Sequence, residues 1–89
     1  MDEKDLIRQV VYCGPNLPKY GITQYQVYLG GYPVNLKEAI AVCPEIEKLI
    51  VGIDELEKTR RNIKIKGTIE QLRYERICGR MGINYAFTW

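Results

Sequence analysis

A segment rich in glycine, proline and tyrosine constrains the fold of this chain more than any other feature. It spans residues 12–33, reads YCGPNLPKYGITQYQVYLGGYP, and holds five of the seven tyrosines, three of the four prolines and four of the eight glycines. Glycine and proline fix unusual backbone shapes, whereas tyrosine offers a flat apolar face with a hydroxyl at its tip. The segment therefore predicts a rigid, aromatic-lined surface loop rather than a plain connector.

The length of the chain predicts one domain over residues 1–89, with residues 1–5 as a flexible N-terminus and residues 83–89 as a docking tail or edge strand. A domain of this size buries a modest share of its surface, so we expect a homo-oligomer. No apolar run approaches the roughly 20 residues of a membrane-spanning helix, and the charged start MDEKDLIRQ is unlike a secretory signal. These features predict a cytoplasmic protein without a membrane partner.

The composition argues against most enzymes, because the chain contains neither histidine nor serine. The commonest general base and the commonest hydroxyl nucleophile are therefore missing. The three cysteines are widely spaced and form no C-x-x-C pair, so we interpret them as reduced, structural residues. Cys13 lies at the entry to the glycine-proline loop, but no spacing supplies it with an activating base. We predict no catalytic residues, no metal and no cofactor.

The basic residues gather in the second half of the chain, although the net charge is only +2. Such a gathering is either the solvated face of two helices or a patch that faces an anion. Nucleic acid is the less favoured partner, because strong nucleic-acid binders carry a clearer basic excess. The basic residues of this region include Lys58, Arg60, Arg61, Lys64, Lys66, Arg73, Arg76 and Arg80.

Apolar patterning predicts the fold class α/β, of the α+β type, as a single small domain. It has a three- to four-stranded mixed sheet and two to three helices, in the order β-β-α-β-α-α with an optional last β. Strands are expected over residues 6–13, 22–29 and 48–53, and helices over residues 36–42, 55–62 and 69–80.

Three capping boxes mark the expected helix starts, each a polar residue followed three positions later by Glu or Gln. The Cys43-Pro44 junction ends the first helix, because the residue before proline disfavours helical geometry. Gly82 ends the last helix. The capping pairs are Asn35 with Glu38, Asp54 with Glu57, and Thr68 with Gln71.

Clean alternation over residues 22–29 predicts which side chains of that strand face the core. Thr23, Tyr25, Val27 and Leu29 share one face, and we expect this face inside. Two glutamines on the other face indicate contact with water, a ligand or another subunit.

The remaining tyrosines of the segment, namely Tyr12, Tyr20, Tyr28 and Tyr32, are candidates for an exposed aromatic cluster. Such a cluster serves either as a subunit contact or as a ligand pocket. The turn that begins at Gly14 lacks the Walker and dinucleotide motifs, so it is a rigid structural turn or a looser anion nest. The candidate ligand-binding residues are Tyr12, Gly14, Pro15, Asn16, Tyr20, Tyr32, Arg60, Arg61 and Arg73.

Several short motifs along the chain form a distinctive set. They are YCGPxLP from Tyr12, GGxP from Gly30, CPxI from Cys43 and LIV from Leu49. Together they resemble small uncharacterised proteins encoded by phages and prophages of Gram-positive bacteria, often near head-assembly genes. The resemblance spans residues 7–75, with Gly52 in place of an expected proline. It implies phage origin and the host cytoplasm, and it names no site.

These observations predict a non-catalytic, phage-derived binding protein with a counter-defence role. It would capture a small anionic, nucleotide-like signal between subunits, with tyrosines stacked on the ligand and arginines on its phosphate. The alternatives are a virion or assembly accessory protein, which acts through protein–protein contacts, and a direct inhibitor of a host defence protein.

Overall fold

Three short strands and four α-helices make up the described part of the protein, which is a computed structural model over residues 9–83. The strands form one sheet in the order β2-β1-β3, with β1 antiparallel to both neighbours. β2 and β3 therefore run parallel to each other on either side of β1. The strands are β1 (Gln9–Tyr12), β2 (Val27–Leu29) and β3 (Ile50–Gly52).

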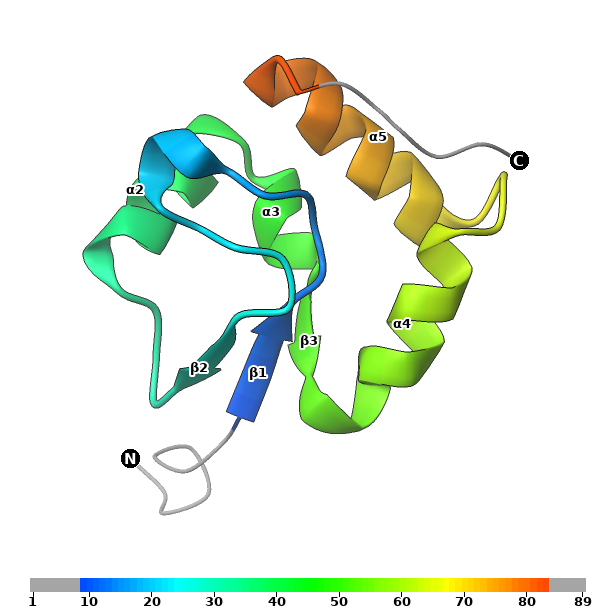
Figure 1. The fold of residues 1–89 in the computed structure, drawn as a ribbon, viewed down its shortest axis with the longest axis horizontal. Helices are drawn as coiled ribbons and strands as arrows, with labels where there is room; N and C mark the ends of the chain where they lie inside the picture. Colours follow the sequence, from blue (N-terminus) through cyan, green and yellow to red (C-terminus); the bar gives the residue numbers. More distant parts are fainter. Residues whose placement is uncertain (1–8, 84–89) are drawn as a thin grey trace.

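The helices lie beyond one end of the sheet and along the β3 side (Figure 1). α2 packs on α3, and α5 packs on both α3 and α4. Two 3-10 helices, η1 (Pro18–Tyr20) and η2 (Ile53–Glu55), lie in the connections. The α-helices are α2 (Val34–Val42), α3 (Glu45–Lys48), α4 (Leu56–Ile63) and α5 (Ile69–Met81). No helix within residues 9–83 has both the length and the apolar character needed to cross a bilayer.

One hydrophobic core joins the sheet to the helices. The central strand contributes its last residues, and each longer helix contributes one or two side chains. Because the three strands and the four α-helices all contribute buried or partly buried residues to the same core, the described residues form one small α+β unit, which confirms the predicted fold class. Buried members of this core include Val11, Tyr12, Leu36, Ala39, Ile46, Leu49, Ile63 and Ile77.

The sheet differs from the prediction in its pairing. We expected a mixed sheet, and both observed pairs are antiparallel. The helical crossover from β2 to β3 does join two parallel strands, but β1 lies between them and supplies the hydrogen bonds to both. The optional fourth strand and the N-terminal residues 1–5 lie outside the described residues, as does most of the predicted tail.

The predicted second strand is mostly a loop and turn. Only Val27–Leu29 of residues 22–29 pair as a strand, and the expected inward face is exposed. Ile22 and Tyr28 are buried instead, whereas Tyr25 is 39% exposed. Tyr25 adds one residue opposite β1, and Ile22 and Tyr28 on either side of it belong to the face that we expected outside, so the buried face was predicted wrongly.

The helix signals from the sequence have mixed outcomes. The chain breaks at Cys43-Pro44 as expected, but it then forms α3, a fourth helix that we did not predict. Asn35 lies inside α2, and its amide donates to the Tyr20 carbonyl at 2.8 Å instead of capping the helix. Asp54 lies in η2, and α4 starts without a side-chain cap. These two capping predictions are wrong, because tertiary contacts and a 3-10 turn take over the helix starts.

The third capping prediction is confirmed. The Thr68 hydroxyl oxygen accepts a hydrogen bond from the Gln71 backbone N–H at 3.1 Å and donates to the Asn62 carbonyl at 2.6 Å. Gly82 ends α5 in the left-handed conformation, with φ of 68°. The Thr68 hydroxyl therefore binds the end of α4 and caps the start of α5.

We expect Thr68→Ala to lower the free energy of unfolding by about 1–2 kcal/mol, because it removes the cap of α5 and one of the hydrogen bonds to the Asn62 carbonyl of α4. Urea denaturation followed by circular dichroism measures the loss. Thr68→Ser keeps the hydroxyl and serves as the control. Equal stability of the alanine and serine variants would show that the cap contributes nothing.

Candidate functional site

The loop that follows β1 is stiff, because its polar groups bond within the loop and to the sheet. Leu17 and Ile22 exchange two backbone hydrogen bonds of 2.8 and 3.1 Å, which close the turn around η1. The side chain of Asn16 accepts the Gln24 backbone N–H at 2.7 Å. Asn16, a predicted ligand residue, therefore anchors the next turn of the loop.

Tyr12 lies in the core and not in an exposed aromatic cluster, which corrects its predicted role. The side chain is 0% exposed, and its hydroxyl donates to the Pro15 carbonyl at 2.7 Å. Burial, first of all, raises the pKa of this phenol far above its usual range. A Cβ at Gly14 would lie 2.6 Å from Cζ of the Tyr12 ring, so the ring packs directly against the turn and leaves no room for a side chain at Gly14. Tyr12, Gly14 and Pro15 are structural and closed to ligand.

Tyr28 is also buried, which removes a second member of the predicted aromatic cluster. Its hydroxyl has no hydrogen-bond partner among the described residues. Burial raises the pKa of this phenol. The charge interaction with Tyr28 contributes to the raised pKa of Tyr12, and both residues belong to the same hydrophobic core.

Tyr25 is the tyrosine that the fold brings to the surface in an unusual conformation. It is the one non-glycine residue with positive φ among those described, at 66°. It is the third residue of a turn in which the Gln26 N–H donates to the Thr23 carbonyl at 3.1 Å. Positive φ at this position belongs to turns that favour glycine or asparagine. Tyrosine there costs about 1–2 kcal/mol in backbone energy.

The same residue forms a β-bulge against the central strand. The Tyr25 N–H donates to the Tyr12 carbonyl at 2.6 Å, and the Tyr12 N–H donates to the Gln26 carbonyl at 3.0 Å. Two residues thus oppose one, in the type of bulge whose first position is usually a left-handed glycine. A bulge changes the direction of the side chains around it. Backbone strain of this kind is often retained at residues that serve a function.

The Tyr25 phenol lies within electrostatic range of α4. Burial raises its pKa most, the Cys13 thiol and the Glu57 carboxylate raise it further, and the Arg60 guanidinium lowers it. Both charges belong to one turn of α4, where a single Arg60 Nη lies 2.8 and 2.9 Å from the two Glu57 oxygens. The side chains of this pair are 47% and 75% exposed, so the pair is weak and easily exchanged.

A basic hollow extends from this pair along α4. It encloses about 510 Å³ and is lined by Glu57, Arg60, Arg61, Lys64 and Ile65. Three cations against one carboxylate leave the hollow with net positive charge, which suits an anion. We call Tyr25 and these five residues the Tyr25–α4 site.

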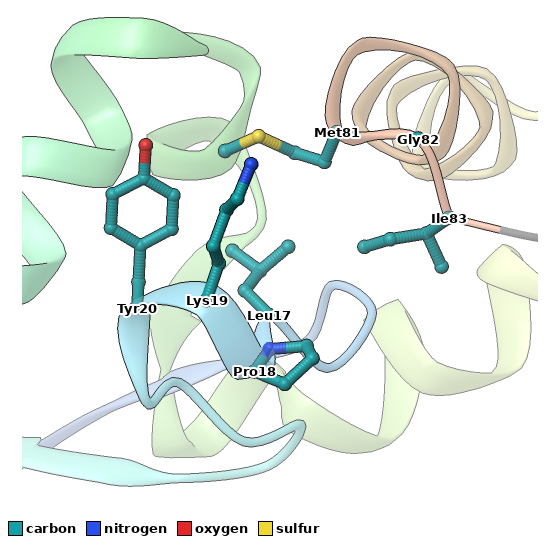
Figure 2. Close-up of a pocket in the computed structure, with 7 residues that line it drawn as sticks. All are labelled: Leu17, Pro18, Lys19, Tyr20, Met81, Gly82 and Ile83. Carbon is teal, nitrogen blue, oxygen red and sulfur yellow. The ribbon is translucent and has the colours of Figure 1, made fainter.

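The predicted site residues do not meet in one pocket of a single chain. Arg60 and Arg61 line the basic hollow, whereas Tyr20 lines the hollow of Figure 2, between η1 and the end of α5. Tyr32 lines a third hollow beside the Gly30-Gly31 turn and Lys37. Arg73 is half-buried on α5. The predicted residues therefore belong to separate surfaces.

Sequence reasoning missed Tyr25 and Glu57 as members of a site, and it placed Lys64 in the basic patch without choosing it as a ligand residue. Glu57 had a readable signal, since Glu and Arg three apart on a helix pair with each other. Tyr25 had none, because a left-handed bulge position is recognised in a sequence by glycine or asparagine. The alternating pattern assigned it to the core instead.

The three thiols of the protein are buried, and burial disfavours the ionised form of two of them, Cys13 and Cys78. Cys13, Cys43 and Cys78 are all free and at most 2% exposed. Burial raises the pKa of Cys13 to about 11, and burial with the Glu75 carboxylate raises that of Cys78 to about 11. A thiol of this kind is a poor nucleophile. Over residues 9–83 no group of three Cys, Asp or Glu side chains is placed to hold a metal ion.

The chain matches no protein-family model, no curated protein and no solved structure. The resemblance to phage proteins therefore stays a prediction from sequence, and the site must be interpreted from its own geometry.

We expect Tyr25→Gly to be more stable than Tyr25→Ala by about 1 kcal/mol, because glycine adopts the left-handed conformation freely. Within a regular strand the order is reversed, since glycine is less stable than alanine by about 0.5–1 kcal/mol. Urea unfolding of the two variants gives the difference. The same pair of substitutions at Val27, in β2, is the matched control. A higher free energy of unfolding for Tyr25→Ala than for Tyr25→Gly would contradict the left-handed bulge conformation at this position.

We expect the free energy of unfolding to fall as the pH rises from about 8.5 toward 11. An unfolded cysteine ionises near 8.5, whereas the folded Cys13 and Cys78 thiols hold their protons to about pH 11. Protonated thiols thus favour the folded state below that window, and the loss is about 3 kcal/mol per thiol across it. Urea titrations at several pH values measure the slope.

Cys13→Ala is the control for this pH dependence, and its slope should be shallower over the same window. A slope identical to that of the parent protein would mean that Cys13 does not contribute.

Proposed function

We propose that this protein is a non-catalytic binding protein that captures a small anionic, nucleotide-like ligand at the Tyr25–α4 site. The proposal rests on the strained, part-exposed phenol of Tyr25, whose charge interactions reach Glu57 and Arg60, and on the basic hollow that begins at those two residues. A planar base stacks on an aromatic ring, and arginine binds phosphate through its planar set of donors. Both kinds of group are present, and both have an exposed side.

The charges of α4 explain how such a ligand would be held. Arg61 and Lys64 make no ion pair with another residue of 9–83, while the Arg60 guanidinium pairs with Glu57. An incoming phosphate offers stronger charge-assisted hydrogen bonds than an exposed carboxylate three residues away. The phosphate of the ligand therefore displaces Glu57 from Arg60, and Arg61 and Lys64 bind it as well.

The proposed biological setting follows the resemblance to phage proteins. Capture of a nucleotide immune signal would make this a counter-defence protein of a phage in the host cytoplasm. A homo-oligomer is part of the proposal, because Tyr20 and Tyr32 line other hollows of the same chain. A second copy is the arrangement that brings one of them to the Tyr25–α4 site.

A protein partner is the second candidate function, either in the virion or its assembly or as a host defence protein that is inhibited directly. The edge strand β2 favours it, since Val27 and Leu29 are 47% and 64% exposed. The adjoining residues 20–36 carry no charged side chain. Uncharged, apolar edges pair with other chains unless they are protected.

Isothermal titration calorimetry against linear and cyclic nucleotides tests the first proposal. We expect binding to at least one nucleotide and a loss of about tenfold or more in affinity for Tyr25→Ala, because stacking on one base contributes about 1–3 kcal/mol. Arg61→Gln should weaken binding as well. Arg76→Gln is the matched control, because Arg76 lies on α5 beside Glu45, at 3.8 Å.

No heat with any nucleotide overturns the ligand proposal and leaves the protein-partner alternative. Equal affinity of the parent protein and Tyr25→Ala overturns the assignment of the site, even if a nucleotide binds.

A further inference from the structure

A second hollow lies between the start of the chain's long loop and the end of α5. Its volume is about 300 Å³. One wall is the loop around η1 and the other is the last turn of α5, some 60 residues later in the chain. Figure 2 shows the side chains of Leu17, Met81 and Ile83 directed into the space between the walls, with Lys19 rising toward Met81. The lining residues are Leu17, Pro18, Lys19, Tyr20, Met81, Gly82 and Ile83.

Both walls are fixed by backbone hydrogen bonds. The η1 wall is closed by the Leu17–Ile22 pair and by the Gly21 N–H, which donates to the Pro18 carbonyl at 3.2 Å. The α5 wall is closed by the Ile83 N–H, which donates to the Cys78 carbonyl at 2.8 Å. The hollow is thus formed before any ligand arrives, which lowers the entropy cost of binding.

The chemistry of the lining is one-sided. Apolar groups dominate it, and Lys19 is its only charged residue. Lys19 makes no ion pair with any other residue of 9–83. The volume of the hollow lies at the lower end of the range for small-molecule pockets, so the hollow suits one ring or one short acyl chain. The apolar walls suit the hydrocarbon part of a ligand, and the Lys19 ammonium group suits a single negative charge on that ligand.

We propose that this hollow binds a small apolar carboxylic acid, with its hydrocarbon part against Leu17, Met81 and Ile83 and its carboxylate on the Lys19 ammonium. This site is separate from the Tyr25–α4 site and does not depend on the function proposed there. It takes a different class of ligand, because its lining is apolar with one cation, whereas the α4 hollow carries three cations and a carboxylate.

The test is a titration of the full chain with octanoate, followed by chemical shifts of labelled backbone amides. We expect saturable shifts at residues 17–20 and 81–83, and affinity that rises by up to about fourfold per methylene from butanoate to octanoate. Octanol, which lacks the charge, should bind about threefold to fivefold more weakly than octanoate.

Two variants separate the charge from the apolar walls. Lys19→Met should lower octanoate affinity to that of octanol and leave octanol unchanged. Ile83→Gln should weaken both ligands. Lys37→Met, on α2, is the matched control and should behave like the parent protein.

Three outcomes overturn the proposal. They are the absence of saturable shifts with octanoate, equal affinity for octanoate and octanol in the parent protein, and shifts that Lys19→Met leaves unchanged.

Discussion

The position of Tyr12 at the end of the central strand is the constraint on which the rest of the structure depends. Its N–H and carbonyl bond to the bulge at Tyr25 and Gln26, and it pairs with Ile50 of β3 on the other side. Its hydroxyl donates to the Pro15 carbonyl and so fixes the loop that follows. One fully buried residue thereby sets the sheet, the glycine-proline turn and the conformation of Tyr25. A buried phenol without this hydrogen bond would be costly, so the turn and the ring require each other.

This arrangement separates tyrosines that look alike in the sequence. Tyr12 and Tyr28 are sealed in the core, and Tyr20 and Tyr32 line different hollows. Among the tyrosines of residues 9–83, only Tyr25 combines a part-exposed ring with a backbone conformation that tyrosine disfavours, and its phenol interacts with charges of α4. Under the proposed function, stability and ligand binding therefore favour different residues at this position. Such conflict is expected where a side chain is kept for binding rather than for folding.

Prediction from sequence succeeded where the physics is local. The Thr68 cap, the break at Cys43-Pro44 and the glycine that ends α5 each depend on a few neighbouring residues. It failed where a distant partner decides. Asn35 bonds to the Tyr20 carbonyl rather than capping its helix, and the second strand buries the face that we expected outside, next to a bulge that its own residues do not announce. Two of the three predicted arginines, Arg60 and Arg61, line one hollow, because charge clustering on a helix is visible in the sequence.

The amino-acid sequence by itself determined the class of the domain, a stiff loop after the first strand, the basic character of α4 and the structural role of the cysteines. Periodicity, proline and glycine geometry, and the absence of histidine and serine suffice for these conclusions. Only the tertiary structure decided which tyrosine is exposed, which strands pair, and that a hollow forms between η1 and the end of α5. The physical reason is that burial and strand register arise from contacts between residues far apart in the chain, which no local pattern encodes.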